Sequence, residues 1–153
     1  MRACLAALAI LAAAWADAQE PRLRLPEWLV PMPDSQAGRP YRVVVNGEAS
    51  VFVNATVDRP LEQVLEHYLQ ACRGRSLLAD LPEEVQRERG LTDGMAIQRA
   101  PGWAMLGFAD RERHTAGVVL FADPDPKAVR TRYYLSWSEG TSPMAEVDPE
   151  KDV

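Results

Sequence analysis

Residue types that most often carry chemistry are sparse in this chain. It has two histidines, His67 and His114, and two cysteines, Cys4 and Cys72. Neither Cys-x-x-Cys, His-x-x-x-His nor Asp-x-Asp-x-Asp spacing occurs, so the sequence supports no zinc site and no EF-hand. Glycine-rich phosphate-binding loops and the Gly-x-Ser-x-Gly turn of serine hydrolases do not occur either. We therefore assign no catalytic residue, no metal ligand and no cofactor.

The thiol of Cys72 is a poor nucleophile by position. It lies on the apolar stripe of a predicted helix, near the C-terminal end. Burial and the helix dipole at that end both oppose the thiolate and so raise the thiol pKa. We interpret Cys72 as a buried structural residue. The alternative is an unpaired thiol that links two chains in an oxidising compartment.

One arrangement of charged and aromatic residues suggests binding. Arg130, Arg132 and Tyr134 alternate along a predicted strand and therefore share one of its faces. Arg42 is expected to join them from another strand, which would form an open surface for a small anionic ligand or an acidic envelope protein. The alternative is the ordinary solvated face of a one-sided sheet.

The N-terminus has the three parts of a signal peptide. Arg2 supplies the positive charge, residues 5–15 are apolar, and Ala16-Asp17-Ala18 places small residues at a cleavage site. The apolar stretch is shorter than the roughly 20 residues that span a bilayer, so no stable membrane insertion is expected after cleavage. Residues 1–18 are therefore predicted to be removed after Ala18, which places the protein in the periplasm or outside the cell.

Composition limits the function classes. The chain has 153 residues and a net charge of −5, which fits one acidic domain. Such a domain is a poor candidate for non-specific binding to nucleic acid or to anionic lipid, because both carry negative charge. No nucleic-acid partner is expected.

An N-terminal arm is predicted over residues 19–40. Its five prolines disfavour a helix or an inner strand, so the segment should be extended. Trp28 and Leu29 form a small apolar cluster within it. These side chains pack on the domain, or they form a docking peptide for a partner.

A hairpin and a helix follow. Asn46-Gly47 favours a two-residue turn that pairs Val45 with Glu48 and Val43 with Ser50. Residues 61–72 place apolar side chains at i, i+3, i+4, i+7, i+8 and i+11, which predicts an amphipathic helix lying across the hairpin.

The second half of the chain is predicted to be mainly strands. A short polar helix over 82–90 and a brief strand over 95–98 come first. Strands over 103–109, 114–122 and 129–137 then form an antiparallel meander, and Val118 to Phe121 is taken as a buried run. Residues 138–153 should be a disordered acidic tail. The predicted fold is α+β over residues 41–137, a single antiparallel sheet of about five strands with one main helix on one face.

Three short motifs give a family resemblance. They are Leu25-Pro26-Glu27-Trp28 leading to Pro31-Met32-Pro33, the helix Pro60-Leu61-Glu62-Gln63-Val64-Leu65-Glu66-His67-Tyr68, and the pair Gly102-Trp103. This layout resembles a kind of small exported bacterial protein, most of them uncharacterised. The resemblance implies an exported α+β domain and no activity.

These observations lead to one expectation and two alternatives. We expect an envelope accessory or binding domain that meets a partner through its sheet face or through the arm at Trp28. One alternative is a small periplasmic enzyme in which His67 or His114 converges with carboxylates. The other is a self-associating structural subunit that uses exposed sheet edges or Cys72.

Overall fold

The predicted hairpin opens the sheet. A computed structural model describes residues 24–45, 47–125 and 127–140, and in it β2 (Tyr41–Val45) pairs with β3 (Glu48–Val57). Val45 lies opposite Glu48 and Val43 opposite Ser50, which confirms the predicted register. Gly47 adopts φ +84°, the left-handed conformation that such a turn needs.

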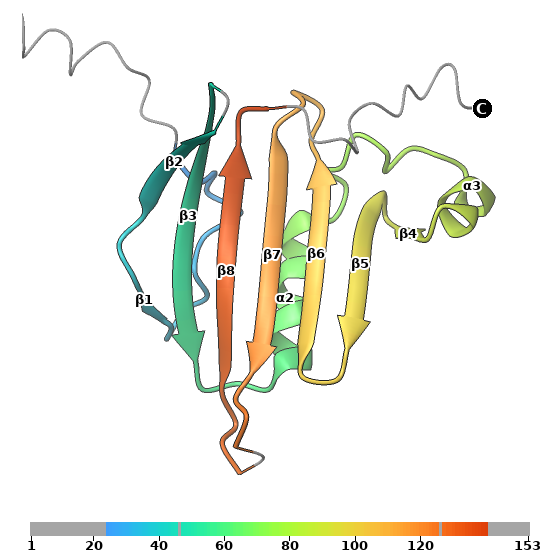
Figure 1. Ribbon diagram of the computed structural model, residues 1–153. Helices are drawn as coiled ribbons and strands as arrows, with labels where there is room; N and C mark the ends of the chain where they lie inside the picture. The colour runs from blue at the N-terminus through green and yellow to red at the C-terminus, as the bar shows by residue number, and fades with distance from the viewer. Residues whose placement is uncertain (1–23, 46, 126, 141–153) are drawn as a thin grey trace, which may run out of the picture.

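The described residues form one antiparallel sheet of eight strands (Figure 1). The other strands are β1 (Gln36–Ala37), β4 (Leu91–Thr92), β5 (Met95–Ala100), β6 (Trp103–Ala109), β7 (Thr115–Ala122) and β8 (Thr131–Ser138). Their order is β1-β3-β8-β7-β6-β5-β4, with β2 also paired to β3. The predicted meander is confirmed as β6, β7 and β8. The predicted number of about five strands is too low, because β1 and β4 have two residues each and leave no periodic signal.

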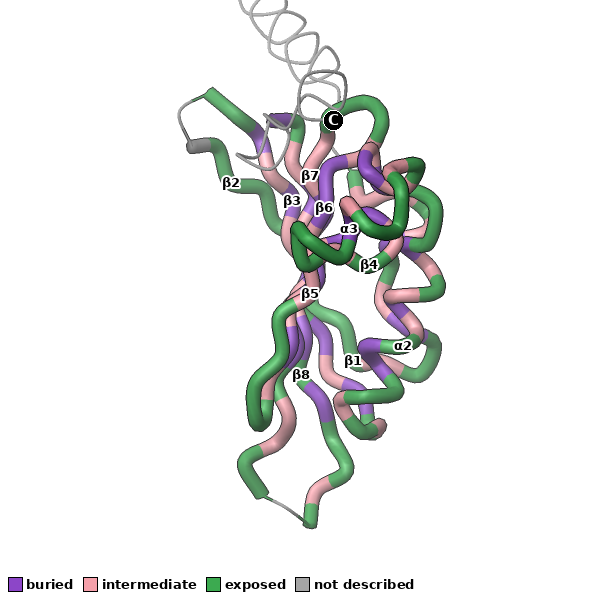
Figure 2. The backbone as a smooth tube through the Cα atoms, turned by 90° about the vertical axis from the view of Figure 1, so that its right-hand side faces the viewer, coloured by how far each residue is buried: buried purple, intermediate pink, exposed green. Residues whose placement is uncertain are grey.

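Two helices accompany the sheet in the described part of the chain. The main one, α2 (Leu61–Cys72), spans the predicted apolar stripe, and it contacts β6 and β7 on one face of the sheet (Figures 1 and 2). The expectation that it lies across the hairpin is therefore wrong. Its buried side chains are Val64, Leu65, Tyr68 and Cys72. The short polar helix is α3 (Glu83–Glu88). Neither has the length and hydropathy of a membrane-spanning segment.

The core lies between α2, residues 24–35 and one face of the sheet, which we call the covered face. Val118, Leu120, Tyr133 and Leu135 on this face are each at most 1% exposed. Leu29 is fully buried in the same cluster, and Trp28 packs against it. The arm therefore packs on the domain, the first of the two predicted alternatives.

Hydrogen bonds from two buried tyrosines hold the arm. The Tyr133 hydroxyl accepts the backbone N–H of Met32 at 2.9 Å and lies 2.6 Å from the Ser35 hydroxyl. Tyr68 donates to the carbonyl of Val30 at 3.0 Å. The predicted signal peptide and nearly all of the predicted acidic tail lie outside the described residues.

Candidate functional site

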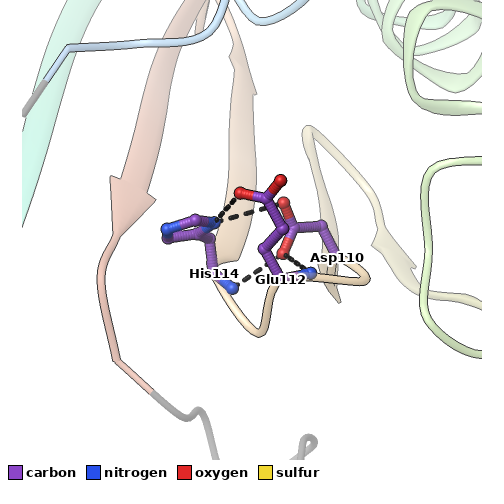
Figure 3. Close-up of side chains that lie close together, drawn as sticks. All are labelled: Asp110, Glu112 and His114. Atoms are coloured by element: carbon purple, nitrogen blue, oxygen red, sulfur yellow. Dashed lines mark hydrogen bonds and ion pairs between the residues drawn. The ribbon is translucent and has the colours of Figure 1, made fainter.

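A turn between β6 and β7 gathers three groups that could do chemistry. Asp110 Oδ1 accepts the backbone N–H groups of Glu112 at 3.0 Å and of His114 at 2.7 Å. Its other oxygen, Oδ2, lies 3.3 Å from His114 Nδ1, and Glu112 Oε2 lies 3.6 Å from the same nitrogen (Figure 3). Sequence inspection did not single out this cluster, because its members are two residues apart in a charged turn.

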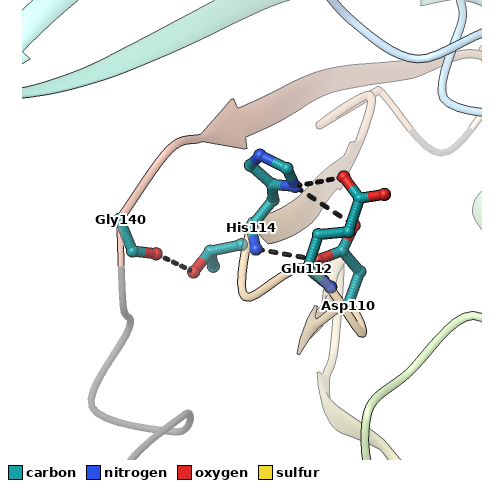
Figure 4. Close-up of polar contacts among 5 residues, drawn as sticks. Asp110, Glu112, His114 and Gly140 are labelled. Atoms are coloured by element: carbon teal, nitrogen blue, oxygen red, sulfur yellow. Dashed lines mark hydrogen bonds and ion pairs between the residues drawn. The ribbon is translucent and has the colours of Figure 1, made fainter.

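The three side chains of this turn could offer one ligand atom each, all within 4.8 Å of one another. Their hydrogen bonds, however, explain the cluster as part of the turn. Arg111 and Arg113 alternate with its members in sequence and oppose a bound cation, and Glu112 is 81% exposed at its side chain. Thr115 Oγ1 donates to the Gly140 carbonyl at 3.1 Å, which ties the turn to the chain after β8 (Figure 4).

A cleft of about 400 Å³ lies beside the turn, between Trp28, Arg75 and Trp137. The Trp28 ring stacks on Phe108 with centroids 5.9 Å apart and meets the edge of Trp137 at 5.5 Å. The guanidinium of Arg75 lies 4.8 Å from the Trp28 ring centroid. Because Phe108, Trp137 and Arg75 all contact the Trp28 ring, Trp28 is a packing residue of the covered face.

Burial makes Cys72 and the nearby Tyr68 unreactive. Cys72 is a free thiol with no exposed surface. Burial raises its pKa to about 12, so the thiol stays protonated at neutral pH. Burial and the neighbouring Tyr133 raise the pKa of Tyr68 as well. The interpretation of Cys72 as a buried structural residue is confirmed.

The second face of the sheet carries neither α2 nor the arm (Figure 2). We call it the open face. Its exposed large hydrophobic side chains are Tyr41 at 48%, Phe121 at 43% and Val43 at 38%. Half-buried beside them lie Phe52, Trp103, Met105, Val119 and Tyr134. Phe121 contacts Tyr134 edge-on at 6.1 Å, and Tyr41 stacks on Phe52 at 5.5 Å.

Charge is scarce on the open face. Among the described strand residues whose side chains point to it, Glu48 and Arg132 are the charged ones. A one-sided antiparallel sheet normally alternates apolar and polar side chains, whereas strands covered on both faces are apolar throughout. β6, with the sequence Trp-Ala-Met-Leu-Gly-Phe-Ala, belongs to the second kind. The open face is therefore the candidate functional surface.

The predicted binding residues are only partly brought together. Arg132 and Tyr134 lie on β8 and point to the open face. Arg130 precedes β8, and its Nε donates to Asp58 Oδ1 at 2.9 Å, a bond that raises the pKa of Arg130. Arg130 and Arg132 line a cleft of about 360 Å³ together with Phe121.

Arg42 and Trp28 do not join that group. Arg42 pairs with Val51, so its side chain leaves the sheet on the side of the covered face. The strand alternation that buries Val51 therefore directs Arg42 away from Arg132, and the expected grouping of Arg42 with Arg130, Arg132 and Tyr134 is wrong. Trp28 packs under the sheet.

The apolar residues of the open face were underestimated from the sequence. Val118 and Leu120 are buried, but Phe121 is 43% exposed and Val119 half-buried, which corrects the expectation that Val118 to Phe121 is buried throughout. The available signal was the uninterrupted apolar run itself. Comparisons with protein-family models, with curated proteins and with solved structures gave no match to this chain.

Proposed function

We propose that this protein is an exported binding domain of the bacterial envelope, without catalytic activity, that engages a partner through its open face. One observation carries the proposal: most large side chains on this face are apolar or aromatic, although no described segment covers them. Monomeric proteins rarely leave such a patch exposed unless it binds something.

The residue types on this face suit protein recognition. Tyrosine, tryptophan, phenylalanine and methionine are enriched where interfaces are buried, and charged residues other than arginine are depleted. Trp103, Met105 and Tyr134 follow this composition, with Arg132 at the border. The predicted anionic ligand would bind in the cleft of Arg130 and Arg132, at the edge of the same face.

The segment before the described residues supports the envelope location. Arg2, the apolar stretch 5–15 and Ala16-Asp17-Ala18 have the order of a cleavable signal, and the layout of the domain resembles exported bacterial proteins. N-terminal sequencing of the protein recovered from cell fractions tests this directly. The proposal expects Gln19 as the first residue, and a retained Met1 in the cytoplasmic fraction would contradict it.

A small enzyme is the second candidate, and the turn at His114 favours it. The imidazole converges with Asp110 and Glu112 beside a cleft, as that alternative requires. His67 has no such carboxylate partners among the described residues, and burial followed by the charge of Arg59 lowers its pKa. An enzyme of this kind would depend on His114 and would tolerate changes on the open face.

Capture from envelope extract separates the two functions. The tagged full chain, processed by the cell, is compared with Val119→Asp, with an Arg130→Ala/Arg132→Ala pair and with His114→Gln. Our proposal expects Val119→Asp to lose the captured protein by about tenfold or more, because it buries an unpaired charge. His114→Gln should bind as the wild type does. The Arg130→Ala/Arg132→Ala variant measures how much the arginines at the edge of the open face contribute to binding. Capture that survives Val119→Asp and fails with His114→Gln would overturn the proposal.

A further inference from the structure

Along β6, β7 and β8 the side chains of the open face are small at one end of the strands and large at the other. At one end of β6, β7 and β8 the open-face residues form a small half: Gly107, Ala109, Thr115, Gly117, Ser136 and Ser138. At the other end they form a bulky half: Trp103, Met105, Val119, Phe121, Arg132 and Tyr134. The face is therefore a step, low at one end of the strands and high at the other.

The strand register aligns this step across β6, β7 and β8, and the alignment ends at β3, where Phe52 lies beside Ser136 and Asn54 beside Tyr134. Gly107 pairs with Gly117, which pairs with Ser136, so these form one row across the strands. The next row along the strands joins Met105, Val119 and Tyr134. The boundary between the small half and the bulky half runs between these two rows, at right angles to the strands.

We propose that a second copy of this chain covers the open face, related by a two-fold axis that lies along this boundary. The inference rests on the proposed function and names the partner. The rotation sets each low row against a high row of the other copy. The facing pairs are Gly107 with Met105, Gly117 with Val119, Ser136 with Tyr134, Ala109 with Trp103, Thr115 with Phe121, and Ser138 with Arg132. Two sheets packed in this way lie about 10 Å apart, and a two-fold contact must be self-complementary in this manner.

Charge agrees with the same rotation. The Glu48 carboxylate lies where a side chain on Gly140 would project. The axis sets Gly140 opposite Arg130 of the second copy, beside Arg132. Glu48 therefore reaches the cleft of about 360 Å³ of the other copy, which is lined by Arg130, Arg132 and Asp123. Arg130 is already bonded to Asp58, so Arg132 is the partner of Glu48 in this contact, and the pair forms twice in the dimer. Arg132 makes no ion pair among the described residues, so its charge is available for this contact.

Gly107 gives independent support. A Cβ added there would lie 3.7 Å from the Ala116 carbonyl oxygen, an ordinary contact, and its φ is not positive. The chain itself therefore does not require glycine at this position, although glycine weakens a strand interior. Glycine within a strand often marks the close approach of another backbone or ligand. Gly117 differs, because its Cβ would collide with the Ser136 hydroxyl of the same chain.

Charge reversal across the axis tests the proposal. Sedimentation of the full chain, processed by the cell, over a range of concentrations should show a monomer–dimer equilibrium. Glu48→Arg and Arg132→Glu should each weaken self-association by about 100-fold, because like charges then meet across the interface. An equal mixture of the two variants should regain the dimer. In the mixed dimer the introduced arginine meets the introduced glutamate, and the native Glu48 meets the native Arg132.

Gly107→Leu and Val44→Glu complete the experiment. Gly107→Leu keeps the fold, as circular dichroism checks, and should leave only monomer, whereas Val44→Glu, exposed on β2 away from the open face, should dimerise normally. A wild type that stays monomeric would contradict the proposal that a second copy covers the open face. A mixture that fails to recover the dimer would contradict it as well. Face-dependent capture of a different protein from extract would then leave the binding function standing. A dimer that appears only after residues 141–153 are deleted overturns the proposal in favour of that segment.

Discussion

The two faces of the sheet are built from the same strands and end in different surroundings. On β7, Val118 and Leu120 are at most 1% exposed, while their neighbour Phe121 is 43% exposed. The sequence of the strand is apolar on both sides, so the strand does not create this difference. The helix α2 and the arm, which lie on one side, create it. A strand that is apolar on both sides thus predicts that both faces are buried. Only the tertiary structure shows whether the same chain buries them.

Leu120→Ala should break the covered face most severely. Leu120 is fully buried, and its truncation removes apolar contact and leaves a cavity. We expect the free energy of unfolding to fall by about 2–5 kcal/mol. Urea denaturation followed by circular dichroism measures this loss. A loss below about 1 kcal/mol would show that the covered face is loosely packed.

Tyr133→Phe should loosen the arm with a smaller effect. The change leaves the buried N–H of Met32 without its acceptor and removes the contact to Ser35. We expect a loss of about 1–3 kcal/mol in unfolding free energy and faster proteolysis within residues 24–35. Tyr134→Phe is the matched control, because that hydroxyl points to the open face. Equal protease resistance in both variants would contradict the role of Tyr133.

Phe121→Ala should change the stability of the isolated chain least of the three variants. It tests the open face of β7, as Leu120→Ala tests the covered face of the same strand. Its ring is partly in solvent, so we expect the unfolding free energy of dilute protein to change by about 1 kcal/mol or less. The concentration dependence of stability should change more, because binding to the native state adds stability. A loss equal to that of Leu120→Ala would show that the open face is covered within one chain.

Local signals in the sequence predicted most of the fold. The turn at Asn46-Gly47 predicted the register of β2 and β3, and apolar spacing predicted the presence of α2 and its buried side. β6 was also placed with the correct bounds, because Gly102 and the charged turn at Asp110 delimit it. Pairing between distant strands leaves no local signal, so the position of β8 between β3 and β7 could not be predicted.

The candidate surface was predicted less well than the fold. Arg132 and Tyr134 were placed on one face correctly, because alternation along a single strand is a local property. The expected place of Arg42 was wrong although the register of β2 with β3 was predicted, because that register pairs Arg42 with Val51, on the covered face. The change of size between Met105 and Gly107 occurs on one strand, but its alignment with β7 and β8 depends on the register between strands, which the sequence does not show.

The position of β8 between β3 and β7 also determines when the sheet can form as a whole. Both its neighbours bond to it along most of their length, and β3 lies more than seventy residues earlier in the chain. β8 is the last of the described strands to leave the ribosome, so a nascent chain that ends before it lacks the element that joins the two parts of the sheet. Sheets joined by such distant pairings form slowly. The two parts of the described sheet therefore stay unjoined until β8 is available to pair with both of them.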